Sequence, residues 1–135
     1  MFCLKELAAF NCKLGQIASM KEFNNTSREL DCLNLSHNDL QDSLDIIFDL
    51  GLFTHSLGEL ILVNCDLKDH HFDKIITRIS GGDLTQIDIS NNQICAFNAL
   101  HHLSINCPLI ESIALANCLI EDGSPFNQET HLPFQ

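Results

Sequence analysis

One pattern recurs five times along this 135-residue chain and limits what it can fold into. The copy at residues 30–40, LDCLNLSHNDL, has leucine at its first, fourth, sixth and eleventh positions and asparagine at its ninth. The other copies span residues 4–14, 57–67, 84–94 and 110–120, so the starting points 4, 30, 57, 84 and 110 are almost evenly spaced. One copy would carry little information because leucine is common. Five copies at near-constant spacing indicate a chain built from repeated structural units.

The ninth position of the pattern alternates between two residue types. The second and fourth copies have Asn38 and Asn92, whereas the first, third and fifth have Cys12, Cys65 and Cys118. An asparagine amide at a turn can hydrogen-bond backbone groups, and a small buried thiol can substitute weakly for it. We therefore predict that these five residues form a structural turn ladder.

Each copy predicts a strand and a turn, and the residues between copies predict a helix. Phenylalanine and isoleucine recur at helical spacing over residues 72–79, and Gly81-Gly82 ends that run. We expect further helices at residues 17–23, at 44–48 with Ser43 as cap and Gly51 as end, around Phe97, Leu100 and Leu103, and from Ser124-Pro125 onward.

The whole chain resembles the leucine-rich repeat family. Its alternation of cysteine and asparagine resembles the ribonuclease-inhibitor-like, cysteine-containing subtype of that family. The resemblance implies an α/β fold: a right-handed curved solenoid of five repeats, with a parallel sheet on the concave face and helices on the convex face. Members of the family mostly act as protein-binding scaffolds, but the binding residues of one member do not transfer to another.

A single unit of this length cannot fold alone. Ordering it costs on the order of 40 kcal/mol, whereas each apolar side chain returns only about 2 kcal/mol. Stacked units share one core, so we predict a single array over residues 1–135. Terminal units of such arrays normally carry a polar cap, and nothing upstream covers Leu4 or Leu7. We therefore expect an excerpt of a longer array, or a homodimer formed through an uncapped end.

Composition narrows the classes of partner and compartment. The net charge of −11, from 7 basic and 18 acidic residues, disfavours nucleic acid and anionic membranes as partners. No apolar run approaches the roughly 18 residues of a membrane span, and Lys5-Glu6 interrupts the place of a signal-peptide core. An odd count of 7 cysteines without a C-x-x-C pair favours free thiols in a reducing compartment. We expect a cytoplasmic protein, with the nucleus as an open alternative.

The residues between the leucines are predicted to face outward on the concave side of the sheet, because side chains alternate along a strand. This face includes Ser36, His37 and Ser90, and it is acidic with an apolar spot. A protein or peptide with a basic surface would complement it. The predicted partner-binding residues are Glu6, Phe10, Asn34, Glu59, Ile61, Val63, Gln86 and Asp88.

Two other kinds of site have candidate residues. Cys32 and His37 could be the nucleophile and base of a cysteine hydrolase, but five residues of extended chain separate them by roughly 16 Å. A base must lie within about 3 Å of its proton donor. His70-His71 and His101-His102 are candidate metal ligands, but adjacent helical residues point apart. We interpret both pairs as surface histidines and expect no metal and no cofactor.

These observations predict a non-catalytic protein-interaction module that binds its partner on the concave sheet face. One alternative is a structural segment of a larger protein, or one that self-associates through an uncapped end. A cysteine hydrolase is the other alternative.

Overall fold

Short strands alternate with helices along the chain. The computed structural model describes residues 6–8, 30–41, 44–49, 51, 53–119 and 125–126, and for residues 6–8, 46 and 125–126 it describes the backbone only. In chain order the elements are β1 (Glu6–Ala8), β2 (Cys32–Asn34), α1 (Leu44–Asp49), β3 (Glu59–Ile61), α2 (Asp69–Ile79), β4 (Gln86–Asp88), α3 (Ala96–Asn106), β5 (Ser112–Ala114), β6 (Cys118–Leu119) and β7 (Pro125–Phe126).

Strands β1 to β5 form one parallel sheet whose strand order is the order of the sequence. Leu33 pairs with Leu60, Leu60 with Ile87, and Ile87 with Ile113. Partners on neighbouring strands therefore hold the same position in successive copies of the sequence pattern. Parallel strands need a connection of about a dozen residues or more, which the helices help to supply. The predicted α/β class with a parallel sheet is confirmed.

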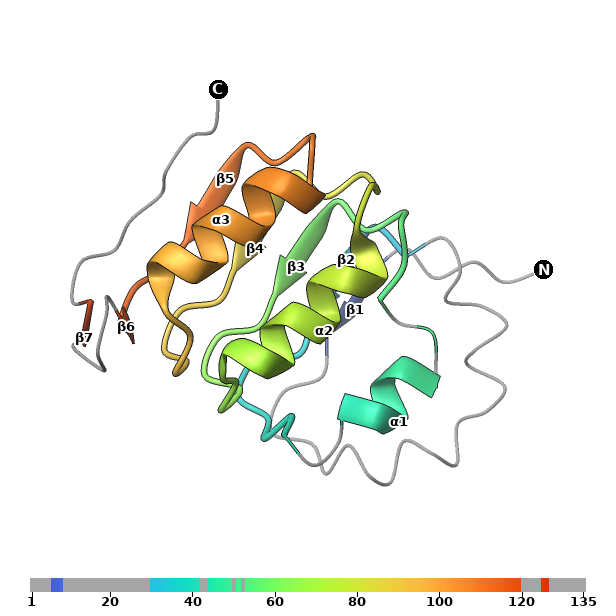
Figure 1. The fold of residues 1–135 in the computed structure, drawn as a ribbon. Coiled ribbons are helices and arrows are strands. Elements are labelled where there is room, and N and C mark those ends of the chain that lie inside the picture. Colours follow the sequence, from blue (N-terminus) through green and yellow to red (C-terminus); the bar gives the residue numbers. More distant parts are fainter. Residues whose placement is uncertain are drawn as a thin grey trace.

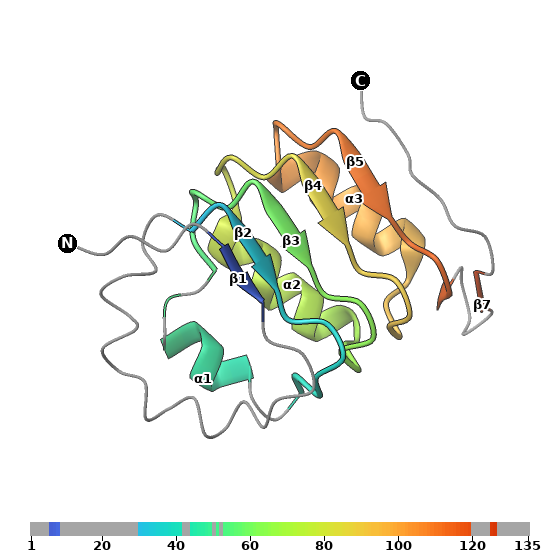
Figure 2. The same cartoon turned by 180° about the vertical axis from the view of Figure 1, so that it is seen from behind.

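The described helices lie on one side of the sheet. Figure 1 shows α2 and α3 side by side in front of the strands, with α1 below them. Figure 2 shows the opposite face of the sheet, which no described element covers and which we call the open face. Among the described residues, no helix is long and apolar enough to cross a membrane.

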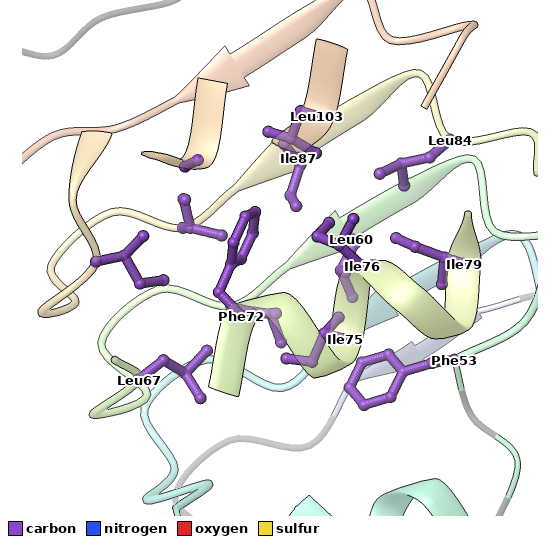
Figure 3. Packing of buried hydrophobic residues seen from close by; sticks show 14 of the residues in the cluster. Phe53, Leu60, Leu67, Phe72, Ile75, Ile76, Ile79, Leu84, Ile87 and Leu103 are labelled. Atoms are coloured by element: carbon purple, nitrogen blue, oxygen red, sulfur yellow. The ribbon is translucent and has the colours of Figure 1, made fainter. Parts of the chain in front are cut away.

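Aliphatic side chains from successive strands line up in rows between the sheet and the helices. Figure 3 shows Leu60 and Ile87 of the sheet beside Phe72 and Ile76 of α2. Burial of each such side chain stabilises the fold by about 1.5–3 kcal/mol. Two such rows are formed by the described side chains. They are Leu33, Leu60, Ile87 and Ile113 in one row, at most 3% exposed, and Leu35, Leu62, Ile89 and Leu115 in the next, at most 1% exposed.

Helices α1, α2 and α3 lie where the sequence predicts helices. Helix α1 ends at Asp49, and Gly51 two residues later has a positive φ of 68° and donates its N–H to the Phe48 carbonyl at 3.0 Å. Helix α3 begins at Ala96. Its residues at positions 96, 99 and 103 are buried and point into the core. Phe97 is turned about 100° away from that direction and is 55% exposed. Phe97 therefore lies outside the buried side of the helix that Leu103 belongs to.

The sequence predicts a helix that begins at Ser124-Pro125, but the structure shows a strand at Pro125. Pro125–Phe126 forms β7, which pairs antiparallel with β6. Five residues separate the two strands, a length typical of a hairpin loop. Proline lacks a backbone N–H and is tolerated in such an edge strand. Ser124 and the expected helix at residues 17–23 lie outside the described residues.

His71 is buried, which corrects its interpretation as a surface histidine. Its side chain is 9% exposed, and its Nδ1 atom accepts the backbone N–H of Lys68 at 3.0 Å. This bond satisfies a donor at the start of α2, where the first N–H groups have no partner within the helix. The acceptor role requires a neutral ring with no proton on Nδ1. Burial, followed by the charges of His70, Lys74 and Lys68, lowers the pKa of His71, and Asp66 opposes that shift.

We expect Gly82 to tolerate no side chain. A Cβ atom there would lie 2.6 Å from the carbonyl oxygen of His55, whereas a Cβ on Gly81 would meet nothing within 4 Å. Gly82→Ala should lower the free energy of unfolding by about 1–3 kcal/mol because the backbone must shift. Gly81→Ala should cost about 1–2 kcal/mol, since φ is 78° there. Urea unfolding measures the free energy of unfolding of both variants. An unchanged free energy of unfolding in Gly82→Ala would contradict the close packing at this position.

We also expect the folded state to lose stability in acid through His71. The unfolded state binds a proton below about pH 6.5, whereas folded His71 resists protonation. The contribution of His71 to the free energy of unfolding is therefore complete above about pH 6.5. It decreases as the pH is lowered further, by at most about 1.4 kcal/mol per pH unit. His71→Gln keeps an acceptor without a titrating ring, so urea unfolding between pH 8 and 5 should show a weaker pH dependence. His101→Gln, at an exposed position, is the control. Equal slopes for wild type and His71→Gln would refute the assignment.

Candidate functional site

The open face is hollowed where β3, β4 and β5 lie next to one another. Glu59, Gln86 and Ser112 are paired across these strands, as are Ile61, Asp88 and Ala114 two positions further along. The small side chains on β5 leave room beside the longer ones on β3 and β4. The resulting hollow has a volume of about 120 Å³ and is lined by Glu59, Ile61, Gln86, Ile87, Asp88, Ser112 and Ala114.

Negative charge collects around this hollow. Glu59 and Asp88 stand diagonally on neighbouring strands, roughly 8 Å apart by strand geometry. The exposed residues Asp31 and Glu111 add two carboxylates just before β2 and β5. The lysine and arginine side chains of the described residues, Lys68, Lys74 and Arg78, belong instead to α2 or to its N-terminal boundary. The field over the open face is therefore negative, and an approaching cation is attracted to it.

The two carboxylates also make local hydrogen bonds. One oxygen of Glu59 lies 3.5 Å from the Cys32 thiol, which donates to it. One oxygen of Asp88 accepts the backbone N–H of Ser90 at 3.0 Å. These bonds orient the side chains on the face and leave the carboxylates as acceptors for a further donor, because an ionised carboxylate has about four lone-pair sites.

The hollow brings together four of the eight predicted partner-binding residues: Glu59, Ile61, Gln86 and Asp88. Asn34 of β2 lies beside Ile61 of β3, and the Asn34 Oδ1 atom accepts the Ser36 backbone N–H at 3.1 Å. Val63 follows β3 and is half-buried. Glu6 is opposite Cys32 in the sheet, but its side chain lies outside the description, and Phe10 lies outside the described residues altogether.

Two serines expected on the outer face are buried instead. Ser36 is 3% and Ser90 is 6% exposed. The Ser36 hydroxyl accepts the Val63 backbone N–H at 3.0 Å, and the Ser90 hydroxyl accepts that of Ala116 at 3.1 Å. Burial of these short side chains is favourable because each satisfies a backbone donor of the next unit. The sequence signal was present in the Ser-x-Asn triplet shared by the second and fourth copies.

The residue after this position adopts a left-handed backbone in every described copy. His37, Asn64, Asn91 and Asn117 have φ between 55° and 62°, a region in which asparagine is tolerated better than most residues. Their exposed side chains also touch: Asn64 Nδ2 lies 3.3 Å from His37 Nδ1, and Asn117 Nδ2 donates to Asn91 Oδ1 at 2.7 Å. This column therefore has a structural role at the turn.

Asn92 hydrogen-bonds the backbone of two successive units. Its Oδ1 accepts the N–H groups of Cys65 at 2.9 Å and Leu67 at 3.1 Å. Its Nδ2 donates to the Leu62 carbonyl at 2.8 Å and to the carbonyls of Ile89 and Ser90 in its own unit. The side chain is 4% exposed, so water does not compete for these bonds.

The other members of the predicted turn ladder make related bonds. Asn38 donates to the carbonyls of Leu35 and Ser36. The Cys65 thiol donates to the Leu35 carbonyl, and the Cys118 thiol to the Ile89 carbonyl, each at 3.2 Å. A thiol thus reaches the preceding unit as the Asn92 amide does, but it accepts far less well. Cys12 lies outside the described residues.

Burial suppresses ionisation of the interior thiols. It raises the pKa of Cys65, Cys107 and Cys118 to about 11 each. Such thiols remain protonated near neutral pH and are weak nucleophiles. Cys65, Cys107 and Cys118 are free thiols.

The candidate catalytic and metal residues have other contacts. Cys32 donates to Glu59, and His37 lies against Asn64, so the structure supplies no contact between the proposed nucleophile and base. His102 Nε2 lies 3.3 Å from Asp73 Oδ1, across the boundary between α3 and α2. Within the described part of the chain, no group of three histidine, cysteine or acidic side chains could hold a metal ion.

Replacement of Asn92 should destabilise the fold strongly. Asn92→Ala would leave the Cys65 and Leu67 N–H groups without their acceptor in a buried place, at a cost of about 3–5 kcal/mol. Asn98→Ala is the matched control, because its half-buried amide makes one bond, to Asp69 at 3.3 Å, and should cost about 1 kcal/mol. Urea unfolding measures both. Similar losses for the two variants would contradict the role assigned to Asn92.

Comparison with protein-family models, with curated proteins and with solved structures finds no match for this chain.

Proposed function

We propose that this chain is a leucine-rich repeat array: a curved solenoid of five repeats of the cysteine-containing, ribonuclease-inhibitor-like kind. The strand register supports this, because paired residues hold the same pattern position in successive copies. The bonds of Asn92, Cys65 and Cys118 support it as well, since each joins its unit to the preceding one. Stacking of this kind is how repeat units that cannot fold alone share a core.

The function we propose is non-catalytic binding of a basic, extended protein segment on the open face of the sheet. The observation that carries this proposal is the hollow between β3 and β5, in which Glu59 and Asp88 stand beside Ile61. Carboxylates around an apolar floor suit a long cationic side chain, whose methylene stem packs on apolar surface while its charged head binds acids.

The size of the hollow favours a polypeptide over a small molecule. Pockets for small ligands usually enclose about 300–1,000 Å³, whereas this hollow has a volume of about 120 Å³. A space of that size accepts one side chain of a partner that otherwise lies across the face. The sheet separates Glu59 from Lys74 and Arg78 of α2, so these two cations do not neutralise the acidic side chains that would attract such a partner.

The test is a double charge reversal, Glu59→Lys with Asp88→Lys. The probe is a fluorescently labelled 12-residue peptide of alternating arginine and glycine, with a glutamate–glycine peptide as the negative control. We expect the double variant to bind the basic peptide about 100-fold more weakly, at about 1.4 kcal/mol for each carboxylate. Fluorescence anisotropy at several salt concentrations measures the affinity and its electrostatic part.

The matched control is Asp45→Lys with Asp83→Lys, which makes the same change in net charge at two exposed positions away from the open face. It should weaken binding by about threefold or less, through the long-range field alone. Equal losses of affinity in the two double variants would mean that net charge alone, and not the hollow, determines binding of the basic peptide. Unchanged binding by Glu59→Lys with Asp88→Lys would eliminate the hollow as the site.

A further inference from the structure

Helices α2 and α3 expose corresponding positions to solvent, and two of these positions, His70/Phe97 and Arg78/Ile105, change from a polar or charged residue on α2 to an apolar one on α3. Each exposed position of α3 has the same place in its unit as an exposed position of α2, in keeping with the register of the strands. On α2 these positions are His70, Lys74, Thr77 and Arg78, and on α3 they are, in the same order, Phe97, His101, Ser104 and Ile105.

The outer side of α3 exposes apolar side chains on either side of His101. The large hydrophobic side chains exposed in the described part of the chain are Phe97 at 55%, Ile105 at 64% and Leu109 at 52%. Phe97 and Ile105 belong to α3 and are eight residues apart, two steps of the i+4 spacing that runs along one side of a helix. Leu109 lies in the turn after α3. We call these three residues the apolar ridge.

The outer side of α2 exposes two basic residues, of which Arg78 holds the place of Ile105 and Lys74 that of His101. Lys74 and Arg78, which we call the basic ridge, are exposed and one i+4 step apart. The Arg78 guanidinium carbon lies 4.6 Å from the centre of the Phe48 ring of α1. This cation–π contact fixes the arginine stem while its charge stays at the surface.

The two ridges keep a fixed spacing because polar contacts join the helices. Asn98 Nδ2 donates to Asp69 Oδ1, His102 lies 3.3 Å from Asp73, and the Ser80 hydroxyl donates to Asn106 Oδ1 at 3.1 Å. Figure 1 shows α2 and α3 side by side on the same face of the sheet. Packed helices lie about 8–10 Å apart, so the ridges run next to each other.

We propose that the two ridges form a second interaction surface, which binds an amphipathic helix of a partner protein. That helix presents leucine-type side chains to the apolar ridge and carboxylates to the basic ridge. A helix is about 10–12 Å across with its side chains, so it spans both ridges at once. Charge complementarity at Lys74 and Arg78 sets its orientation, and burial of Phe97 and Ile105 supplies most of its affinity.

The surface fits a single helix better than an anionic membrane. A membrane plane would also approach Asp45 and Asp49, which are exposed on α1. Polybasic attachment to lipid typically uses about four to eight lysines and arginines, whereas the described chain has three, Lys68, Lys74 and Arg78. The net charge of −11 adds repulsion from a continuous anionic surface.

The probe is a designed 18-residue helical peptide with leucines along one side and glutamates along one flank. A peptide of the same composition in scrambled order is its control. At about 150 mM salt we expect the designed peptide to bind at least about tenfold more tightly than the scrambled one. Phe97→Ser with Ile105→Asn, and separately Lys74→Glu with Arg78→Glu, should each weaken binding about tenfold. Only the second pair should also reduce the salt dependence.

Glu59→Lys with Asp88→Lys leaves both ridges intact and should bind the designed peptide as the wild type does, which separates this surface from the open face. The side chains replaced in the apolar ridge are more than half exposed, so thermal unfolding should be unchanged. If the variant Phe97→Ser with Ile105→Asn unfolds at a lower temperature than the wild type, the single variant Ile105→Asn is used in its place. Equal binding of the two peptides, or binding insensitive to both ridge variants, would overturn the proposal. So would ridge-dependent binding to vesicles of phosphatidylserine and phosphatidylcholine without peptide binding.

Discussion

The fold depends on the hydrogen bonds that the buried Asn92 amide makes to the backbone of two successive units. Strands of three residues leave most of each turn outside the sheet ladder, so buried N–H and carbonyl groups there need other partners. Asn92 supplies an acceptor to Cys65 and Leu67 and a donor to Leu62. Without these bonds the aliphatic rows on either side would be stacked next to unpaired polar groups, whose burial would cancel part of the free energy that the stacking contributes.

This requirement explains the alternation of asparagine and cysteine. An asparagine both donates and accepts, so it satisfies groups in its own unit and in the preceding one. A cysteine chiefly donates, as Cys65 does to Leu35 and Cys118 does to Ile89. The Cys65 backbone N–H then takes its acceptor from the asparagine of the following unit. Since the turns and rows are fixed in this way, the outward positions of strands and helices are free to differ between units, and the proposed binding surfaces consist of those positions.

Much of the architecture was predictable because stacking of units imposes a period on the sequence. Leu33, Leu60 and Ile87 occupy one row because they share a pattern position. Ser36 and Ser90 were misplaced because strand alternation ends with the short strands, and the backbone then turns them inward. The helix around Phe97, Leu100 and Leu103 was predictable from their spacing, but the exposure of Phe97 was not, because the small residues Ala96 and Ala99 take the buried side. The hollow was not predictable, since it depends on small side chains on β5 beside larger ones on β3. The partner, the cytoplasmic location and the homodimer through an uncapped end stay predictions.

Hydrogen exchange of two backbone amides tests most directly whether side-chain bonds between units hold the fold together. The N–H groups of Cys65 and Leu67 have Asn92 Oδ1 as their acceptor, whereas the Leu62 N–H donates to the Asp88 carbonyl within the sheet at 2.8 Å. The account predicts that Cys65 and Leu67 exchange as slowly as Leu62, because all three open only when the units separate. Exchange of Cys65 and Leu67 at the rate of exposed turn amides, with Leu62 still protected, would contradict it.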